Sequence, residues 1–463
     1  MTQPFSAMIK PVGARCNLRC DYCYYRETNS AAAAGSAGTG GIGAGGCGTD
    51  SRVPGSVPAA QTAATSARIV SSTLNQLPSA PPALLTDQLL ENLIRQYLAA
   101  NPGPAVNFVW HGGEPSLAGL DFFRRVVQLQ QKYLPTGWSC WNNLQTNGQL
   151  LNEEWCAWLA AQHFDVGLSI DGPQPSHDRY RRSADGRGSW AAAAAALRRL
   201  QQAGLQPDLL CTVNAANERA GLLTYQALRD FNTGWIEFIP VVNRTADSSV
   251  SAESVSAQGY GDFLCTVFTD WALHDLGRLD VQLFAELLRV QAGGVAGLCW
   301  LAPTCGRAVV VEADGSVYSC DHFVQPEYRL GNMAESDLAE LVDSPFQQDF
   351  GQKKQSELPV ACPSCAWLKY CHGGCPKDRW LGADPRQPGL GNYLCSGLQH
   401  FFGYAQPLLA EIVRLNRWQW PAQRIRQALR ELLDERWNQV GRNDPCPCGS
   451  GLKAKSCCWA YRP

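Results

Sequence analysis

The sequence of 463 residues has neither a marked charge imbalance nor a long apolar run. Basic and acidic residues nearly balance at a net charge of −2, which gives no electrostatic basis for binding nucleic acid or an anionic membrane. No uncharged segment is long enough to span a bilayer, and the opening MTQPFSAMIKPVGARC lacks the pattern of a signal peptide. We therefore expect a cytoplasmic protein that binds neither nucleic acid nor membranes.

Cysteine, in contrast, is abundant, with 20 residues in the chain. Cysteines in a cytoplasmic protein point to metal sites rather than disulfides. The length suggests two to four domains. Residues 30–82 consist largely of Gly, Ala, Ser, Thr and Pro, a composition that buries too little apolar area to offset its ordering entropy. We expect a disordered insertion there, and a tolerated insertion is favoured over a functional lid.

Strand-like and helix-like segments alternate along the first half of the chain. This pattern predicts parallel βαβ units and an α/β fold, a partial (β/α)6 barrel over 1–245, with functional groups at the C-terminal ends of the strands. The predicted strands cover 5–12, 105–113, 139–148, 165–172, 207–214 and 235–242. We expect a helical linker over 246–295, a cysteine-rich domain over 296–405, a helix over 406–440 and a small tail over 441–463.

Three cysteines, Cys16, Cys20 and Cys23, follow the first predicted strand with the spacing C-x3-C-x2-C. Three thiolates can hold three irons of a 4Fe–4S cluster and leave the fourth iron open for a small ligand. A structural zinc site is the alternative, but it needs four ligands and the loop offers no fourth. The motif resembles that of the radical S-adenosylmethionine (SAM) enzymes, and the resemblance implies that SAM binds the open iron.

A second motif, HGGEP, ends the second predicted strand at Gly112, Gly113 and Glu114. Paired glycines let the backbone approach a ligand closely, and the carboxylate can receive an ammonium group. It resembles the GGE motif of radical SAM enzymes, which implies a contact to the amino group of SAM.

Further contacts to SAM are implied by position in the barrel. Ser169 and Asp171 end the fourth strand, and Gln145, Thr146 and Asn147 end the third. These residues resemble contacts to the ribose and methionine parts of SAM, although ordinary turn caps are the alternative. Tyr22, inside the cysteine motif, is placed to stack on adenine or to pack within the loop.

The second cysteine-rich region carries eight cysteines with a C-x2-C-x5-C-x3-C core. Eight thiolates can ligate two 4Fe–4S clusters completely, which favours electron transfer over substrate binding at iron; zinc sites are the alternative. The region resembles the SPASM domain of peptide-modifying radical SAM enzymes. This resemblance implies one cluster on Cys299, Cys305, Cys320 and Cys375 and another on Cys362, Cys365, Cys371 and Cys395.

The tail holds two close cysteine pairs, which suit a tetrahedral zinc ion better than a frayed end with ordinary thiols. It resembles the SEC-C motif, which implies docking to a partner rather than catalysis. The predicted zinc ligands are Cys446, Cys448, Cys457 and Cys458. We interpret the cysteines outside these motifs as ordinary thiols: Cys47, Cys140, Cys156, Cys211 and Cys265.

Blocks of sequence from residue 5 to about 405 carry a sharper resemblance. They include IKPVGARCNLRCDYCYY, GGEPSLAGLDFF, VGLSIDGP, DGSVYSCDHFV and CPSCAWLKYCHGGCPKDR. Together they resemble the anaerobic sulfatase-maturating enzymes. The resemblance implies oxidation of a cysteine or serine in a C/S-x-P-x-R motif of an unfolded or nascent sulfatase to Cα-formylglycine, with electrons from a low-potential donor. It also implies that Asp321 is the base, provided that it reaches the substrate heteroatom; a solvated loop residue is the alternative.

Two other functions stay open at this point. One is another SPASM-type peptide modification, such as thioether or carbon–carbon cross-linking. The other is a non-catalytic iron–sulfur or zinc scaffold. Asp321 and the lack of an apparent leader-binding domain before the barrel favour oxidation, and a cluster loop with three ligands argues against a scaffold.

Overall fold

The computed structural model describes residues 4–25, 84–245, 249–380, 391–446 and 452–461. The predicted insertion over 30–82, with Cys47, lies outside the described residues, as does Cys448 of the tail.

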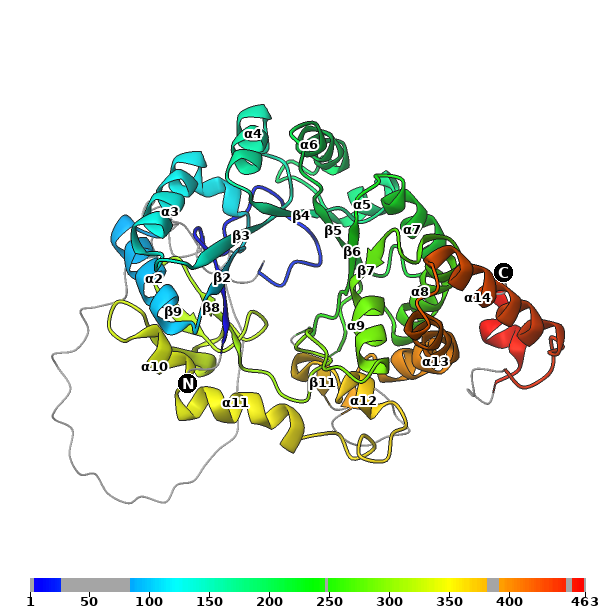
Figure 1. Cartoon of the computed structure of the whole chain (residues 1–463). Helices are drawn as coiled ribbons and strands as arrows, with labels where there is room; N and C mark the ends of the chain where they lie inside the picture. The colour runs from blue at the N-terminus through cyan, green and yellow to red at the C-terminus, as the bar shows by residue number, and fades with distance from the viewer. Residues whose placement is uncertain (1–3, 26–83, 246–248, 381–390, 447–451, 462–463) are drawn as a thin grey trace, which may run out of the picture.

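Ten strands of the described residues form one curved sheet in the order β10-β9-β8-β1-β2-β3-β4-β5-β6-β7. Its centre contains the six predicted strands, which pair in parallel, and β7 joins them in parallel at one end. The sheet curves into an open arc (Figure 1), so the predicted partial barrel is confirmed. The strands are β1 (Ser6–Ile9), β2 (Ala105–Trp110), β3 (Ser139–Thr146), β4 (Asp165–Ser169), β5 (Asp208–Val213), β6 (Trp235–Pro240) and β7 (Asp280–Val281).

Helices cover the outer face of this arc (Figure 1). Side-chain caps fix where two of them begin, because Thr86 accepts a hydrogen bond from the Leu89 amide and Asn152 from the Trp155 amide. Alternate strand residues such as Phe108 and Trp110 are fully buried beneath the helices. The helices are α2 (Asp87–Ala100), α3 (Leu120–Tyr133), α4 (Glu153–Ala161), α5 (Gln174–Tyr180), α6 (Trp190–Gln202) and α7 (Gly221–Arg229).

The cysteine-rich region continues the barrel sheet. Strand β8 (Ala308–Val311) pairs in parallel with β1, with Ala7 opposite Val309, and β9 (Ser316–Tyr318) and β10 (Arg329–Asn332) follow in antiparallel. The C-terminal end of β1 therefore lies beside the end of β8, where the chain turns back into β9. Short elements complete the region: α10 (Leu338–Val342), α11 (Pro345–Ser356), α12 (Leu368–Cys371), β11 (Arg379–Trp380) and β12 (Gly391–Asn392).

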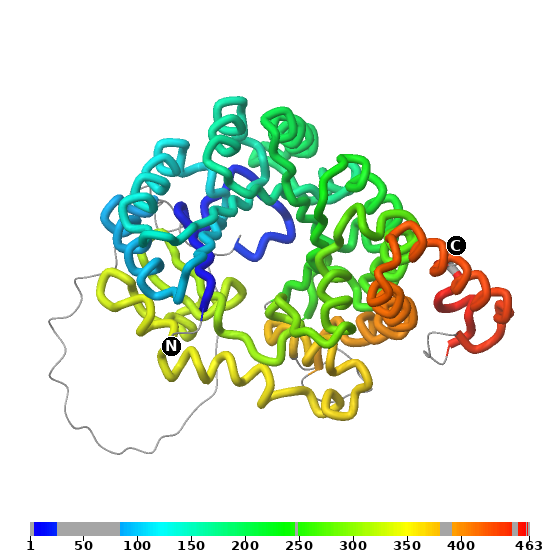
Figure 2. The backbone as a smooth tube through the Cα atoms, viewed as in Figure 1, coloured from blue at the N-terminus to red at the C-terminus, as the bar shows by residue number. Residues whose placement is uncertain are grey.

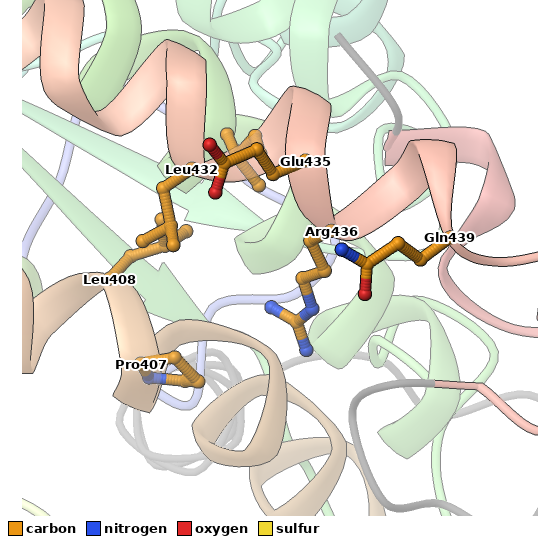
Figure 3. A pocket seen from close by; sticks show the side chains of 7 residues that line it. Pro407, Leu408, Leu432, Glu435, Arg436 and Gln439 are labelled. Carbon is orange, nitrogen blue, oxygen red and sulfur yellow. The ribbon is translucent and has the colours of Figure 1, made fainter.

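The last helices pack on the end of the barrel next to β7 (Figure 1). They are α8 (Ala257–Asp270), the π-helical turn η2 (Trp271–Asp275), α9 (Gln282–Gln291), α13 (Cys395–Arg417) and α14 (Ala422–Asn438). Where the sequence predicts one helix over 406–440, the chain breaks between α13 and α14, because Pro421 is in an extended conformation and caps α14. Between α13 and α14 lies a pocket (Figure 3) lined by Pro407, Leu408, Leu432, Leu433, Glu435, Arg436 and Gln439.

Two glycines let α8 and α13 approach closely. A Cβ atom added at Gly397 would lie 1.7 Å from the Ala257 carbonyl oxygen, and one at Gly261 would lie 2.5 Å from the Gly397 oxygen. The tail packs beyond α13 and α14 (Figure 2). Within the described residues, no helix combines the length and apolar character needed to cross a bilayer.

Candidate active site

The predicted cluster loop runs from the end of β1 into the curve of the sheet (Figure 1). The thiols of Cys16, Cys20 and Cys23 are partly buried and close enough to affect one another electrostatically. Burial raises the pKa of Cys16 to about 11 and that of Cys20 to about 12, and neighbouring thiols of the same loop add to both shifts. Crowded, half-buried thiols need a metal to become thiolates, so this donor set fits an iron–sulfur cluster.

The glycines of HGGEP pack against this loop. A Cβ atom added at Gly113 would lie 2.0 Å from the Arg15 carbonyl oxygen, and Gly112 has a φ of +125°. The amide of Gly113 donates to the oxygen of Gly13 over 2.9 Å. The glycine pair therefore lets the end of β2 support the backbone of the cysteine loop, and its contact to SAM stays a prediction.

Glu114 is buried, which raises its pKa, and its two carboxylate oxygens accept hydrogen bonds from the chain. One oxygen accepts from the hydroxyls of Ser116 (2.5 Å) and Thr146 (2.7 Å), and the other accepts from the Asn147 amide (2.8 Å). The Asn147 side chain in turn lies 3.7 Å from the Cys16 sulfur. Glu114 thus joins the ends of β2 and β3 beneath the cluster loop; its predicted role toward the SAM amino group stays a prediction.

Tyr22 and Asp171 belong to a buried cluster around Arg181. Asp171 accepts hydrogen bonds from the Tyr22 hydroxyl (2.5 Å), from Arg181 Nε (2.8 Å) and from the Thr212 amide (2.8 Å). Burial works to raise the pKa of Asp171, but the charge of Arg181 outweighs it and lowers the pKa. Loop packing, the alternative for Tyr22, accounts for its contacts. Ser169 accepts a hydrogen bond from Gln145 over 3.1 Å. Contacts of these residues to SAM stay predictions.

Asp321 meets the end of the cluster loop. It follows β9 directly after Cys320, and its carboxylate accepts hydrogen bonds from the hydroxyls of Tyr24 (2.5 Å) and Tyr25 (3.2 Å). Its side chain is 15% exposed, unlike that of a solvated loop residue. The structure therefore brings the predicted base to the residues that follow Cys23, about three hundred positions earlier in the chain.

Sequence reasoning missed Lys10, which lies at the end of β1. Its side chain is fully buried, and its Nζ lies 2.5 Å from Asp321, 3.6 Å from Glu312 and 3.9 Å from the centre of the Tyr25 ring. Burial opposes ionisation of Asp321, but the charges of Lys10 and, to a smaller extent, of His111 and His322 hold its pKa well below the usual range. A lysine that ends a buried strand, in IKPV, was the signal available in the sequence.

Comparison with known proteins assigns a family. Residues 11–216 match the Radical SAM superfamily, 299–366 match SPASM, an iron-sulfur cluster-binding domain, and 442–460 match the SEC-C motif. The serine-type anaerobic sulfatase-maturating enzyme of Bacteroides thetaiotaomicron is 34% identical over 422 residues, which cover 88% of this chain and 91% of the relative. The chain belongs to the anaerobic sulfatase-maturating enzymes.

Other relatives agree with this assignment to the anaerobic sulfatase-maturating enzymes. The cysteine-type enzyme of Clostridium perfringens is 28% identical over 412 residues, which cover 88% of this chain and 98% of the relative. A solved structure described as native anSMEcpe with bound AdoMet and Cp18Cys peptide has a TM-score of 0.71 and 27% identity, and covers 89% of this chain and 99% of its own. The predicted radical SAM enzyme class is confirmed, with SAM and iron–sulfur clusters as cofactors; the number of clusters and the zinc ion stay predictions.

The cysteines of the SPASM region form two electrostatic neighbourhoods, that is, two groups within which the thiols raise one another's pKa. Burial raises the pKa of Cys320, to which the thiols of Cys375 and Cys299 add, and Cys299 likewise adds to the effect of burial on Cys305. Separately, burial raises the pKa of Cys371, to which the thiols of Cys362 and Cys365 add. Cys395 begins α13.

Two basic residues lie among these thiols, and neither was identified from the sequence. Lys354 is fully buried and its Nζ donates to the carbonyl oxygens of Cys299 (2.9 Å), Trp300 (3.1 Å) and Ala302. Burial lowers the pKa of Lys354 to about 8. Arg379 donates to the carbonyls of Gly373, Lys354 and His372 and is near thiols of both neighbourhoods, so a positive charge lies between them.

The tail packs against the body of the protein. Tyr461 donates to Asp262 of α8 over 2.6 Å, and the ring of Trp459 lies edge-on to Trp437 of α14. Cys446 and Cys458 are buried in the same core as these helices. Of the four predicted zinc ligands, Cys446, Cys457 and Cys458 are described, and a histidine of α13, His400, joins Cys457 and Cys458.

Proposed function

We propose that this chain oxidises a cysteine or serine within a C/S-x-P-x-R motif of an unfolded or nascent sulfatase to Cα-formylglycine. The observation that carries the proposal is the position of Asp321. Its carboxylate contacts Tyr24 and Tyr25, which follow the cluster loop, and it follows Cys320, a proposed ligand of an auxiliary cluster. Asp321 would therefore accept a proton between the cluster loop, which binds SAM in this proposal, and the auxiliary-cluster region, which accepts the electron.

The proposed chemistry removes one hydrogen atom, one electron and one proton from the target residue. When bound, SAM and the cluster on Cys16, Cys20 and Cys23 supply the abstraction of hydrogen from Cβ, and the auxiliary clusters supply the acceptor for the electron. Asp321 takes the proton from the hydroxyl or thiol. Serine then yields the aldehyde directly, whereas cysteine yields a thioaldehyde that water hydrolyses with release of hydrogen sulfide.

Lys10 determines at which step of the reaction Asp321 can accept a proton. Because the ammonium group holds the pKa of Asp321 low, the carboxylate is ionised at neutral pH but is a weak base. A hydroxyl or thiol beside a carbon radical is far more acidic than an ordinary one. Asp321 is therefore matched to removing the proton after hydrogen abstraction, and not from the resting substrate.

We assign the remaining cofactors by the same reasoning. The two neighbourhoods of thiols support one 4Fe–4S cluster on Cys299, Cys305, Cys320 and Cys375 and a second on Cys362, Cys365, Cys371 and Cys395. A low-potential donor would reduce the cluster on Cys16, Cys20 and Cys23, in the cytoplasm. The tail would hold one zinc ion, and its contacts with α8 and α14 support a role within this chain rather than docking to another protein.

A peptide assay tests the proposal. The anaerobically reconstituted protein is incubated with SAM, a strong reductant and a peptide that carries either C-x-P-x-R or S-x-P-x-R. We expect a product that reacts with a hydrazine, with loss of two hydrogen atoms from the serine peptide. A peptide with alanine at the target position is the control. A cross-linked product, or cleavage of SAM with an unchanged peptide, contradicts the proposal, and the former would favour the cross-linking alternative.

A further inference from the structure

A histidine outside the SEC-C motif faces the cysteines of the tail. His400 lies on α13, and its Nδ1 is 3.5 Å from the sulfur of Cys457, whose sulfur is 3.7 Å from that of Cys458. The three potential ligand atoms lie within 4.8 Å of one another. The His400 side chain is only 7% exposed, so the imidazole is buried in the protein and held close to these sulfurs.

The two separations that involve the Cys457 sulfur match tetrahedral zinc. With Zn–N bonds of about 2.0–2.1 Å and Zn–S bonds of about 2.3 Å, a tetrahedral ion holds a nitrogen and a sulfur about 3.5 Å apart and two sulfurs about 3.8 Å apart. An ordinary hydrogen bond from a thiol requires neither the second sulfur nor its distance. The geometry around His400 therefore favours a shared metal ion over a simple contact between side chains.

The other ring nitrogen of His400 supplies a second, independent observation. Its Nε2 is buried, has no hydrogen-bond partner among the described residues, and faces Asp262 Oδ1 at 3.6 Å. Histidines that bind a metal through one nitrogen generally direct the other N–H toward a carboxylate, which fixes the ring and its tautomer. Asp262 is itself held by the Tyr461 hydroxyl of the tail.

The packing of α8 on α13 explains how these groups meet. Gly261 and Gly397 form the close contact between the two helices. Asp262 follows the first glycine directly, and His400 lies one helical turn beyond the second. A side chain at either glycine would force the helices apart and separate the carboxylate from the imidazole.

We propose that His400 Nδ1 is a ligand of the tail zinc ion, together with Cys457 and Cys458, and that Asp262 orients it. The inference rests on the proposed zinc ion, and it changes the ligand set, because a tetrahedral ion that binds His400 does not need all four cysteines of the motif. Cys446, buried in the same core, is the described candidate for the fourth position. The ion joins the tail to α13, whose first residue, Cys395, is a proposed ligand of an auxiliary cluster.

X-ray absorption at the zinc edge of the full-length, reconstituted protein tests this ligand set without interference from iron. We expect one nitrogen at about 2.0–2.1 Å and three sulfurs at about 2.3 Å. Four sulfurs and no nitrogen would overturn the role of His400 and leave the zinc ion in place. Absence of zinc after loading would overturn both the role of His400 and the zinc ion itself. Neither result decides whether the protein forms formylglycine, which the peptide assay tests separately.

Variants then distinguish a ligand from a packing residue. H400N should lower the zinc affinity at least tenfold in a chelator competition, and D262N should lower it about 10–100-fold. H400C should restore binding with an additional sulfur, which also guards against a folding defect of H400N. The matched control is H274N, because His274 also faces an aspartate, Asp270, at 3.2 Å but contacts no tail cysteine in the described structure. Wild-type affinity in H400N, or failure of H400C to regain zinc, would refute the proposal.

Discussion

Replacing Asp321 by asparagine is the sharpest test of the proposed base. The amide keeps the size of the side chain and can still pair with Tyr24, but it cannot take up a proton. Loss of a positioned general base lowers rates by about 10²–10⁴-fold. We therefore expect D321N to cleave SAM in the presence of peptide but to form aldehyde at least a hundred times more slowly than the wild type.

The substitution also removes an ion pair from the buried Lys10, whose remaining carboxylate partner, Glu312, lies at 3.6 Å. Breaking a buried pair on one side costs about 3–5 kcal/mol, and less where a partner is partly exposed, as Asp321 is at 15%. Thermal unfolding of the reconstituted protein measures this separate effect. Activity is therefore compared at a temperature where both proteins are folded.

Glu312 provides the matched control. Its side chain is 16% exposed, close to that of Asp321, and it also pairs with Lys10, but it follows β8 and not a proposed cluster ligand. We expect E312Q to be destabilised yet to form aldehyde within a few-fold of the wild type. The assay follows deoxyadenosine and aldehyde in the same reaction. Equal losses of aldehyde in the two variants, or equal losses of aldehyde and SAM cleavage in D321N, would refute the reasoning.

Three further predictions concern the scaffold. G113A should displace the cluster loop, since the added Cβ would lie 2.0 Å from the Arg15 oxygen, and the variant should lose SAM cleavage and iron. G234A is the control: no heavy atom lies within 4 Å of a Cβ added at Gly234, so this variant should keep both. D171N leaves Arg181 buried without its carboxylate and should cost about 3–5 kcal/mol at pH 7 by thermal unfolding. Because the pKa of Asp171 is lowered in the folded chain, the pair stabilises it above the usual aspartate range, and this difference between D171N and wild type should shrink as the pH falls through the lowered pKa. K354M removes the ammonium group that donates to three carbonyl oxygens near Cys299. Each acceptor left buried and unpaired costs about 1–3 kcal/mol of stability, so K354M should lower the iron content of the protein. K353M is the control, because it removes only an exposed ion pair with Asp349 and should leave the iron content unchanged.

The six barrel strands and their helices were predictable because the period of apolar residues changes along the chain and each strand ends in a recognisable turn. Helix α5 was missed, since QPSHDRY is short and begins beside Pro173. The predicted helix over 406–440 began too late, because α13 already begins at Cys395, within the predicted cysteine-rich domain; it runs through Pro407, and tertiary packing outweighs the local cost of a proline.

The candidate site divides in the same way. The cysteine motifs and Asp321 were identified because their spacing is local and the family motifs are specific. Contacts of Lys10, Tyr24 and Tyr25 with Asp321 depend on β8 pairing with β1, which no local pattern encodes. His400 was missed for a related reason, because it meets the tail cysteines only when α13 has packed on α8.

The pairing of β1 with β8 bears on how this protein can be divided. Strand β1 has β2 on one side and β8 on the other, and its Ala7 and Ile9 are fully buried. A chain truncated before β8 would expose one edge of a short apolar parallel strand, the kind of edge on which foreign strands pair and aggregates grow. The barrel and the cluster-binding region thus share one sheet despite their separate sequence signatures, and an exchange of one without the other would need a new pairing partner for β1.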